Sequence, residues 1–167
     1  INLNEINSNV ANLKGGLTPF GFEVISEMEN LGMIIDVSHL SDQGFYDVLK
    51  LSKKPFVASH SNARTTCGHN RNLTDEMIRS IAESGGVIGI NYHPPFLIDF
   101  PENYSKEDEK AAKITDIINH IKYIKNIAGC GCISLGSDFD GIAGNDGLQN
   151  ASQLPLLEDA LAKEGFS

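Results

Sequence analysis

The sequence lacks the excess of positive charge that a polyanionic partner requires. It has 13 Lys and Arg residues against 22 Asp and Glu residues, which gives a formal net charge of −9 at pH 7. A chain with this balance offers no basic stripe to nucleic acid or to anionic lipid. It also has no apolar run near the roughly 20 residues that cross a bilayer, and no basic start followed by an apolar segment. We therefore expect no nucleic-acid partner, no membrane segment and no secretory signal in this chain.

Cysteine is scarce as well. The three cysteines, Cys67, Cys130 and Cys132, cannot all pair with one another, and none has the CxxC spacing of a zinc or redox site. Unpaired thiols are typical of a reducing compartment. We therefore predict a cytoplasmic protein without a disulfide framework.

What the chain does contain is a regular alternation of two hydrophobic patterns. With 41% hydrophobic residues over 167 positions, it can bury one core, which indicates a single domain over residues 1–167. Helical spacing and short continuous apolar runs follow one another along the chain. The expected helices cover residues 19–31, 41–51, 74–83 and 110–128, and the expected buried strands cover residues 33–39, 55–60, 86–91 and 132–139. This alternation predicts an α/β fold built from parallel β/α units.

Polar side chains stand at the ends of the expected strands. His39, His60 and Asp138 end three of them, and Asn91 ends the fourth. In parallel β/α architectures the carboxyl ends of the strands carry the chemistry, and imidazole and carboxylate groups are ligands for a divalent metal. The pattern favours a metal site, although a histidine at a strand end is also compatible with a hydrogen-bonded rim residue.

Three segments carry a family resemblance. They are GGLTPFGFEVISEMENLGMIIDVSHLSD (15–42), VASHSNARTTCGHNRNLTDEMI (57–78) and ISLGSDFDG (133–141). In this order they closely resemble the membrane dipeptidase (renal dipeptidase) family of zinc peptidases. The resemblance implies zinc-dependent hydrolysis of dipeptides by a metal-activated water, with two zinc ions in the complete family site.

The resemblance also implies roles for individual residues. His39 and His60 match two metal ligands of the family, and Asp138 matches the acid/base beside the metals. Arg71 matches the arginine that holds the terminal carboxylate of the substrate, and we expect Asn91 to contact the substrate too. These roles suit the groups, because a guanidinium fork fits a carboxylate and an aspartate near a metal can transfer a proton.

Two family elements have no match in this chain. The family uses an HxD pair early in its catalytic domain and a bridging glutamate on a middle strand. The sequence has no HxD before residue 39 and no glutamate at the end of an apolar strand ahead of residue 15. The resemblance therefore implies the C-terminal half of a TIM (β/α)8 barrel, one partial domain that is inactive by itself. The alternatives are a non-catalytic barrel fragment or carboxylate-binding module and, more weakly, another amidohydrolase-type metal hydrolase. The sequence is also compatible with a homo-oligomer.

Other polar residues have plainer interpretations. Asp36 is either a partner that orients a ligand histidine or a satisfied polar group in the core, and the two are equally favoured. We expect Arg64 and His69 to be solvated loop residues, His93 to have a structural role, and His120 to pack in the outer layer of helices.

Overall fold

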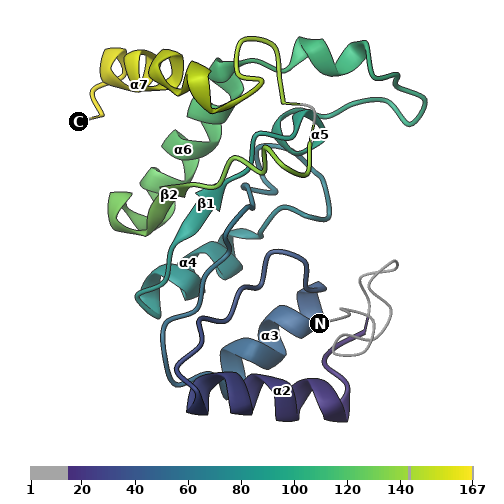
Figure 1. Ribbon diagram of the computed structural model, residues 1–167, viewed down its shortest axis with the longest axis vertical. Coiled ribbons are helices and arrows are strands. Elements are labelled where there is room, and N and C mark those ends of the chain that lie inside the picture. Colours follow the sequence, from purple (N-terminus) through teal and green to yellow (C-terminus); the bar gives the residue numbers. More distant parts are fainter. Residues whose placement is uncertain (1–14, 143, 167) are drawn as a thin grey trace.

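The computed structural model describes residues 15–142 and 144–166. Figure 1 shows successive helices and extended segments along the long axis, from α2 and α3 at one end to α6 and α7 at the other. The elements are α2 (Pro19–Asn30), α3 (Asp42–Leu51), α4 (Asp75–Glu83), β1 (Ile88–Ile90), α5 (Pro94–Leu97), the 3-10 helix η2 (Asp108–Ala111), α6 (Ile114–Ala128), the 3-10 helix η3 (Cys130–Cys132), β2 (Ile133–Leu135), the 3-10 helix η4 (Ala151–Gln153) and α7 (Leu154–Lys163). No helix in these ranges is long and apolar enough to span a membrane.

The extended segments pair in parallel and in chain order. Asp36 bridges to Val57, and Ala58 bridges to Ile88. Strands β1 and β2 then pair in parallel, with Ile88 opposite Ile133. Each segment therefore lies beside the next one along the chain, which confirms the prediction of parallel β/α units.

The first two strands are much shorter than predicted, because residues 33–39 and 55–60 form only single bridges. One reason is the Asp36 carboxylate, which accepts hydrogen bonds from the backbone N–H groups of Ser38 (3.1 Å) and Ser59 (3.0 Å). Those N–H groups are then not available for hydrogen bonds with a neighbouring strand. Met33 and Ile34 are 54% and 70% exposed, so the run that begins there is not a buried strand.

Two glycines allow the segment that ends in His60 to approach both named strands. A Cβ atom added at Gly89 or at Gly136 would lie 2.0 Å from the carbonyl oxygen of Ser59. No side chain fits at that distance, so glycine is required at both positions. The backbone N–H of Ser61 donates to the oxygen of Gly89 (2.8 Å), which fixes the chain immediately after His60.

The helices begin where local sequence signals place them. Thr18, Ser41 and Thr74 are N-caps whose side-chain oxygens accept from the backbone N–H groups of Gly21 (3.1 Å), Gly44 (3.0 Å) and Met77 (3.3 Å). Such a cap stabilises a helix by about 1 kcal/mol. The predicted helix at 110–128 was too long at its start, because the Asp116 carboxylate accepts from the N–H of Lys113 and begins α6 at Ile114.

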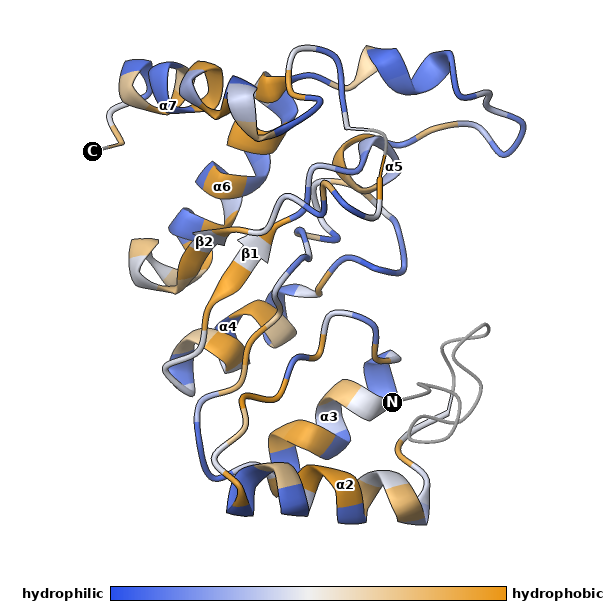
Figure 2. Ribbon diagram, viewed as in Figure 1, coloured by the Kyte–Doolittle hydropathy of each residue, from blue (hydrophilic) through white to orange (hydrophobic). Residues whose placement is uncertain are grey.

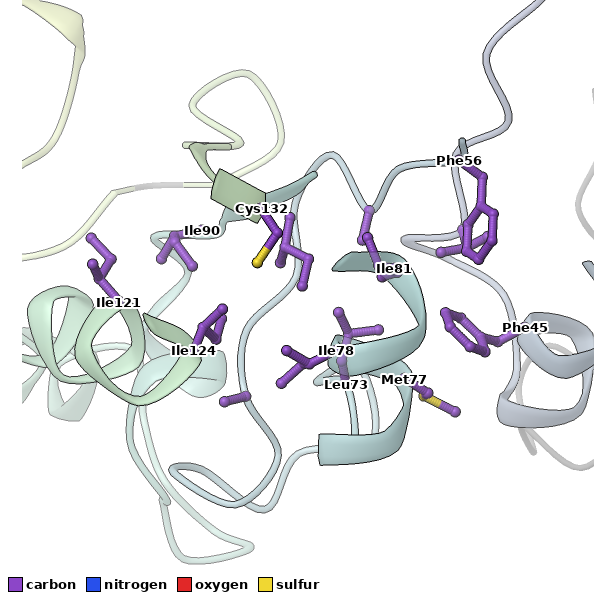
Figure 3. Close-up of a cluster of buried hydrophobic side chains, with 14 of the residues drawn as sticks. Phe45, Phe56, Leu73, Met77, Ile78, Ile81, Ile90, Ile121, Ile124 and Cys132 are labelled. Carbon is purple, nitrogen blue, oxygen red and sulfur yellow. The ribbon is translucent and has the colours of Figure 1, made fainter. Parts of the chain in front are cut away.

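The hydrophobic core lies between the extended segments and the helices. Figure 2 shows apolar residues on β1 and on parts of α4 and α6. In Figure 3, Ile78 and Ile81 of α4 lie between Phe45 and Phe56 on one side and Ile124 of α6 on the other. These five side chains are at most 2% exposed. The core therefore joins consecutive β/α units.

His120 packs in the layer of helices, on α6, as predicted, and it is also a buried cross-link in this core. Its side chain is fully buried in α6, where Nδ1 accepts from the backbone N–H of Ala63 (3.1 Å). Nε2 therefore carries the proton and donates to the carbonyl oxygen of Leu97 (3.1 Å). Burial lowers the pKa of His120 to about 4. The neutral ring ties three segments of the chain together.

The low pKa of His120 predicts loss of stability in acid. Between the ordinary pKa of 6.5 and the folded-state pKa of about 4, the unfolded chain binds a proton that the folded chain excludes. The free energy of unfolding should therefore fall as pH drops through this window, by about 3 kcal/mol at 1.4 kcal/mol per pH unit. Urea unfolding at a series of pH values measures this fall.

His120→Gln is the control for this titration, because its amide keeps one donor and one acceptor but does not ionise. The difference in unfolding free energy between His120→Gln and the natural chain should shrink from neutral pH to pH 4. If the unfolding free energies of the two proteins fell by the same amount as the pH was lowered, another group would cause the acid sensitivity.

Candidate functional site

His39 and His60 meet beyond the carboxyl ends of the first two extended segments. Each follows one of the first two extended segments, and their Nε2 atoms lie 2.8 Å apart. The ring centroids are 4.8 Å apart and the planes are inclined by 56°. The structure thus confirms that the two strand-end histidines converge.

The surroundings of His39 favour its neutral form. Partial burial lowers the pKa of His39, and the positive charges of Arg71 and His60 lower it further, while Asp138 and Asp36 oppose the shift. A neutral imidazole keeps a lone pair on one ring nitrogen, which is the form that binds a metal. The direction of the shift therefore suits a ligand histidine.

Asp36 organises the backbone beneath the histidines. Asp36 keeps substantial access to solvent, so the interpretation as a core polar group was wrong. Its carboxylate accepts from the hydroxyl groups of Ser38 (2.8 Å) and Ser59, in addition to their backbone N–H groups. Partial burial raises the pKa of Asp36, but these hydrogen bonds outweigh it and hold the pKa below its usual value. The Ser59 hydroxyl in turn lies 2.7 Å from Nδ1 of His60.

Asp138 lies in a strained turn beyond β2. Its φ angle is 65°, the only positive value among the described non-glycine residues. Such backbone costs energy and is concentrated at functional sites. The N–H of Gly141 donates to the carbonyl oxygen of Asp138 (2.9 Å), and a Cβ at Gly141 would lie 2.5 Å from Oδ1 of Asp138. The turn therefore fixes the direction of this carboxylate.

The side chain of Asn91 positions the carboxylate of Asp138. Its Nδ2 donates to Oδ2 of Asp138 (3.1 Å), and its Oδ1 accepts from the N–H of His93 (2.7 Å). Asn91 is fully buried, so the predicted contact with substrate stays a prediction, and the contact present is with Asp138. A hollow of about 640 Å³ opens beside Asp138, lined by Ser137, Asp138, Phe139, Asp140, Gln149, Asn150 and Ala151.

Arg71 reaches the same area from the loop after His60. Its Nε donates to the carbonyl oxygen of Ser38 (3.0 Å), and the guanidinium carbon lies 5.3 Å from the ring centroid of Phe96. Its buried Nη2 has no acceptor among the described residues. Burial lowers the pKa of Arg71, whereas Asp138 and Asp36 raise it. A guanidinium with one nitrogen unsatisfied is suited to an incoming carboxylate.

Two loop residues are not solvated, contrary to the sequence interpretation. Arg64 donates through Nη1 and Nη2 to the carboxylate of Asp42, both at 2.7 Å. Nδ1 of His69 accepts from the backbone N–H of Arg71 (3.1 Å), and its ring lies 4.5 Å from that of Phe96. Both residues hold the loop that carries Arg71.

Phe96 is a site residue that sequence reasoning missed. The rings of His69 and His93 and the guanidinium of Arg71 all pack on it. Its carbonyl oxygen accepts from the buried amides of Asn62 (3.1 Å) and Asn72 (2.9 Å). Its sequence context, a Pro-Pro-Phe run, carries no signal for such a role.

The donor set fits part of a metal site. Two imidazole nitrogens face one another and the Asp138 carboxylate is near enough to affect the pKa of His39. Within residues 15–142 and 144–166, however, no group of three or more His, Cys, Asp and Glu side chains is arranged to hold a metal ion. Catalytic zinc sites use about three protein ligands, so two facing imidazoles are fewer than such a site needs.

Comparison with known proteins places these residues in context. The model of a family described as membrane dipeptidase matches residues 3–167. An uncharacterised protein in the pqqA 5' region of Klebsiella pneumoniae is 40% identical over 90% of this chain, and the dipeptidase aclJ of Aspergillus oryzae is 35% identical over 92%. A metallopeptidase of Rhodobacter sphaeroides, solved with a phosphinate mimic of the dipeptide L-Ala-D-Ala, superimposes with a TM-score of 0.80 at 33% identity over 91% of this chain.

The chain spans only part of the proteins that it matches. It covers 54% of the Klebsiella protein, 35% of the Aspergillus dipeptidase and 42% of the Rhodobacter metallopeptidase.

Proposed function

Because this chain belongs to the membrane dipeptidase family, we propose that the complete protein hydrolyses dipeptides with a bound zinc ion held in part by His39 and His60. The observation that carries this proposal is the 2.8 Å approach of the two Nε2 atoms. Two imidazoles brought together from separate strand ends are the start of a metal site.

Zinc, when bound, supplies a Lewis acid and a water of lowered pKa. The residues of this chain then bind and orient the substrate. Arg71 would hold its terminal carboxylate through the nitrogen that lacks an acceptor. Asp138, held by Asn91 beside the open hollow, would take a proton from water and give it to the leaving amine. Asn91 would support this proton transfer by holding the Asp138 carboxylate, and its own contact with the substrate stays a prediction.

We further propose that the parallel units of this chain form one half of a TIM (β/α)8 barrel, with residues 1–167 as one partial domain. The support is the consecutive parallel pairing from Asp36 to β2. Half a barrel cannot close, since eight strands are needed. The missing metal ligands would come from the other half, so the isolated chain should bind zinc weakly and should not hydrolyse dipeptides.

Hydrolysis of L-Ala-D-Ala tests this function. The complete protein should release free alanine, lose activity to a chelator and recover it with zinc, whereas the isolated chain should be inactive. Calorimetry should show weak zinc binding to the isolated chain, because it supplies only two imidazole ligands. Hydrolysis that is insensitive to chelation would contradict the zinc site, and tight zinc binding by the isolated chain would contradict the half-site.

The alternative is a carboxylate-binding module without catalysis. It is favoured by one observation, the unsatisfied Nη2 of Arg71, which requires no metal. This alternative predicts dipeptide binding by the complete protein that survives chelation and is not followed by hydrolysis. The same assay therefore separates the two functions.

A further inference from the structure

We infer that Ser59, held by Asp36, fixes His60 in the tautomer that carries its proton on Nδ1, which leaves Nε2 as an electron-pair donor. Ser59 is thus a positioning residue for His60. The tautomer follows from hydrogen bonds of this chain alone, and its use for a metal rests on the proposed function.

The argument begins at the Asp36 carboxylate. An ionised carboxylate has acceptors only, so every group in contact with it must donate. Oδ2 of Asp36 contacts the hydroxyl of Ser59. Ser59 has one hydroxyl hydrogen, and it is directed to Asp36. The reverse arrangement would place two acceptor oxygens against each other.

The tautomer of His60 follows from the second contact of the same hydroxyl. Oγ of Ser59 lies 2.7 Å from Nδ1 of His60 and has no hydrogen left to donate. Nδ1 must therefore carry the proton and donate to Oγ. In a neutral imidazole the other nitrogen then has the lone pair, and Nε2 is the atom that faces His39 at 2.8 Å.

The backbone of Ser59 is held in place from several directions, which keeps its hydroxyl beside both Asp36 and His60. Its backbone N–H donates to Oδ1 of Asp36 (3.0 Å), and its carbonyl oxygen packs against Gly89 and Gly136. The backbone N–H of His60 donates to Oγ of Ser38 (3.0 Å), whose own hydrogen goes to Asp36 (2.8 Å). The backbone and the ring of His60 are therefore both set by the same carboxylate.

His39 must take the complementary tautomer in the metal-free protein. The Nε2 lone pair of His60 needs a donor at 2.8 Å, and among the described residues the group at that distance is Nε2 of His39, which must therefore carry its proton. The two histidines should thus differ, with the proton on Nδ1 in His60 and on Nε2 in His39. This difference in the protonated nitrogen follows from the hydrogen bonds around each ring and is not predicted by the sequence.

Long-range proton–nitrogen NMR of the metal-free protein, labelled with ¹⁵N at histidine and held at alkaline pH, reads each tautomer directly. The natural protein should show His60 protonated on Nδ1. Ser59→Ala removes the acceptor, so His60 should lose this single-tautomer pattern. Ser61→Ala is the matched control, because it flanks His60 on the other side and its buried hydroxyl has no partner among the described residues. That variant should leave the His60 spectrum unchanged.

A spectrum of the natural protein with His60 protonated on Nε2 would overturn the inference, even if no variant folds. An unchanged His60 tautomer in Ser59→Ala would overturn it as well. Zinc titration gives a second readout, in which Ser59→Ala should weaken affinity roughly tenfold to a hundredfold, as loss of an outer-shell partner does. The NMR experiment needs neither metal nor substrate, so an absence of dipeptide hydrolysis would leave it standing.

Discussion

Replacing His60 by alanine should remove the metal from the complete protein and lower kcat/KM for dipeptides by roughly a thousandfold or more. His60 supplies one of two imidazoles whose Nε2 atoms lie 2.8 Å apart. A metal contributes several kcal/mol of transition-state stabilisation, and each 1.4 kcal/mol is tenfold in rate. Elemental analysis and dipeptide hydrolysis, measured on the same preparation, test both effects.

His120→Gln is the control for this substitution. It changes a histidine that serves the core, through Ala63 and Leu97, and should leave metal content and activity at neutral pH as they are. His60→Ala protein that retains full metal and full activity would remove His60 from the metal site. Equal losses in the two variants would mean that histidine substitutions act through folding.

Arg71→Lys should weaken hydrolysis of free dipeptides much more than that of C-terminally amidated ones. The guanidinium has a buried Nη2 without an acceptor among the described residues, and a lysine ammonium cannot reproduce its planar fork. A hydrogen bond to a charged group contributes about 1.5–3 kcal/mol, which is roughly tenfold to a hundredfold in kcat/KM. Metal content should not change. Parallel assays of the two substrate types measure the ratio.

Arg64→Lys is the matched control, since it lies in the same loop but its guanidinium is already engaged by Asp42. It should lower stability without altering the ratio between free and amidated dipeptides. Equal losses on both substrates in Arg71→Lys would show that Arg71 only tethers its loop, and the role of Arg71 in binding the substrate carboxylate would be removed.

The parts of this fold that could be predicted depend on local signals. Thr18, Ser41 and Thr74 begin helices because a side-chain oxygen within the same turn caps them. The convergence of His39 and His60 could also be predicted, because the carboxyl ends of neighbouring parallel strands meet at one edge. The first two strands are shorter than predicted because the Asp36 carboxylate accepts hydrogen bonds from backbone N–H groups that would otherwise pair with a neighbouring strand.

The parts that could not be predicted depend on contacts between distant residues. Ala63 and His120, which share a buried hydrogen bond, are 57 positions apart in the chain. Phe96 holds Arg71 from another β/α unit, and only the fold brings them together. Asp36 is 23 positions from Ser59, and the Ser59 hydroxyl contacts both Asp36 and the ring of His60. Residue type alone therefore indicates the chemistry of the site, but it does not indicate which distant residues hold the site residues in place.

Anomalous diffraction at the zinc edge, from crystals of the complete protein, tests the central claim most directly. A zinc ion held by His39 and His60 should give a peak about 2.0–2.1 Å from Nε2 of each ring. Binding would also replace the present 2.8 Å contact between those atoms. A peak elsewhere, with the two imidazoles still hydrogen-bonded to each other, would contradict the account.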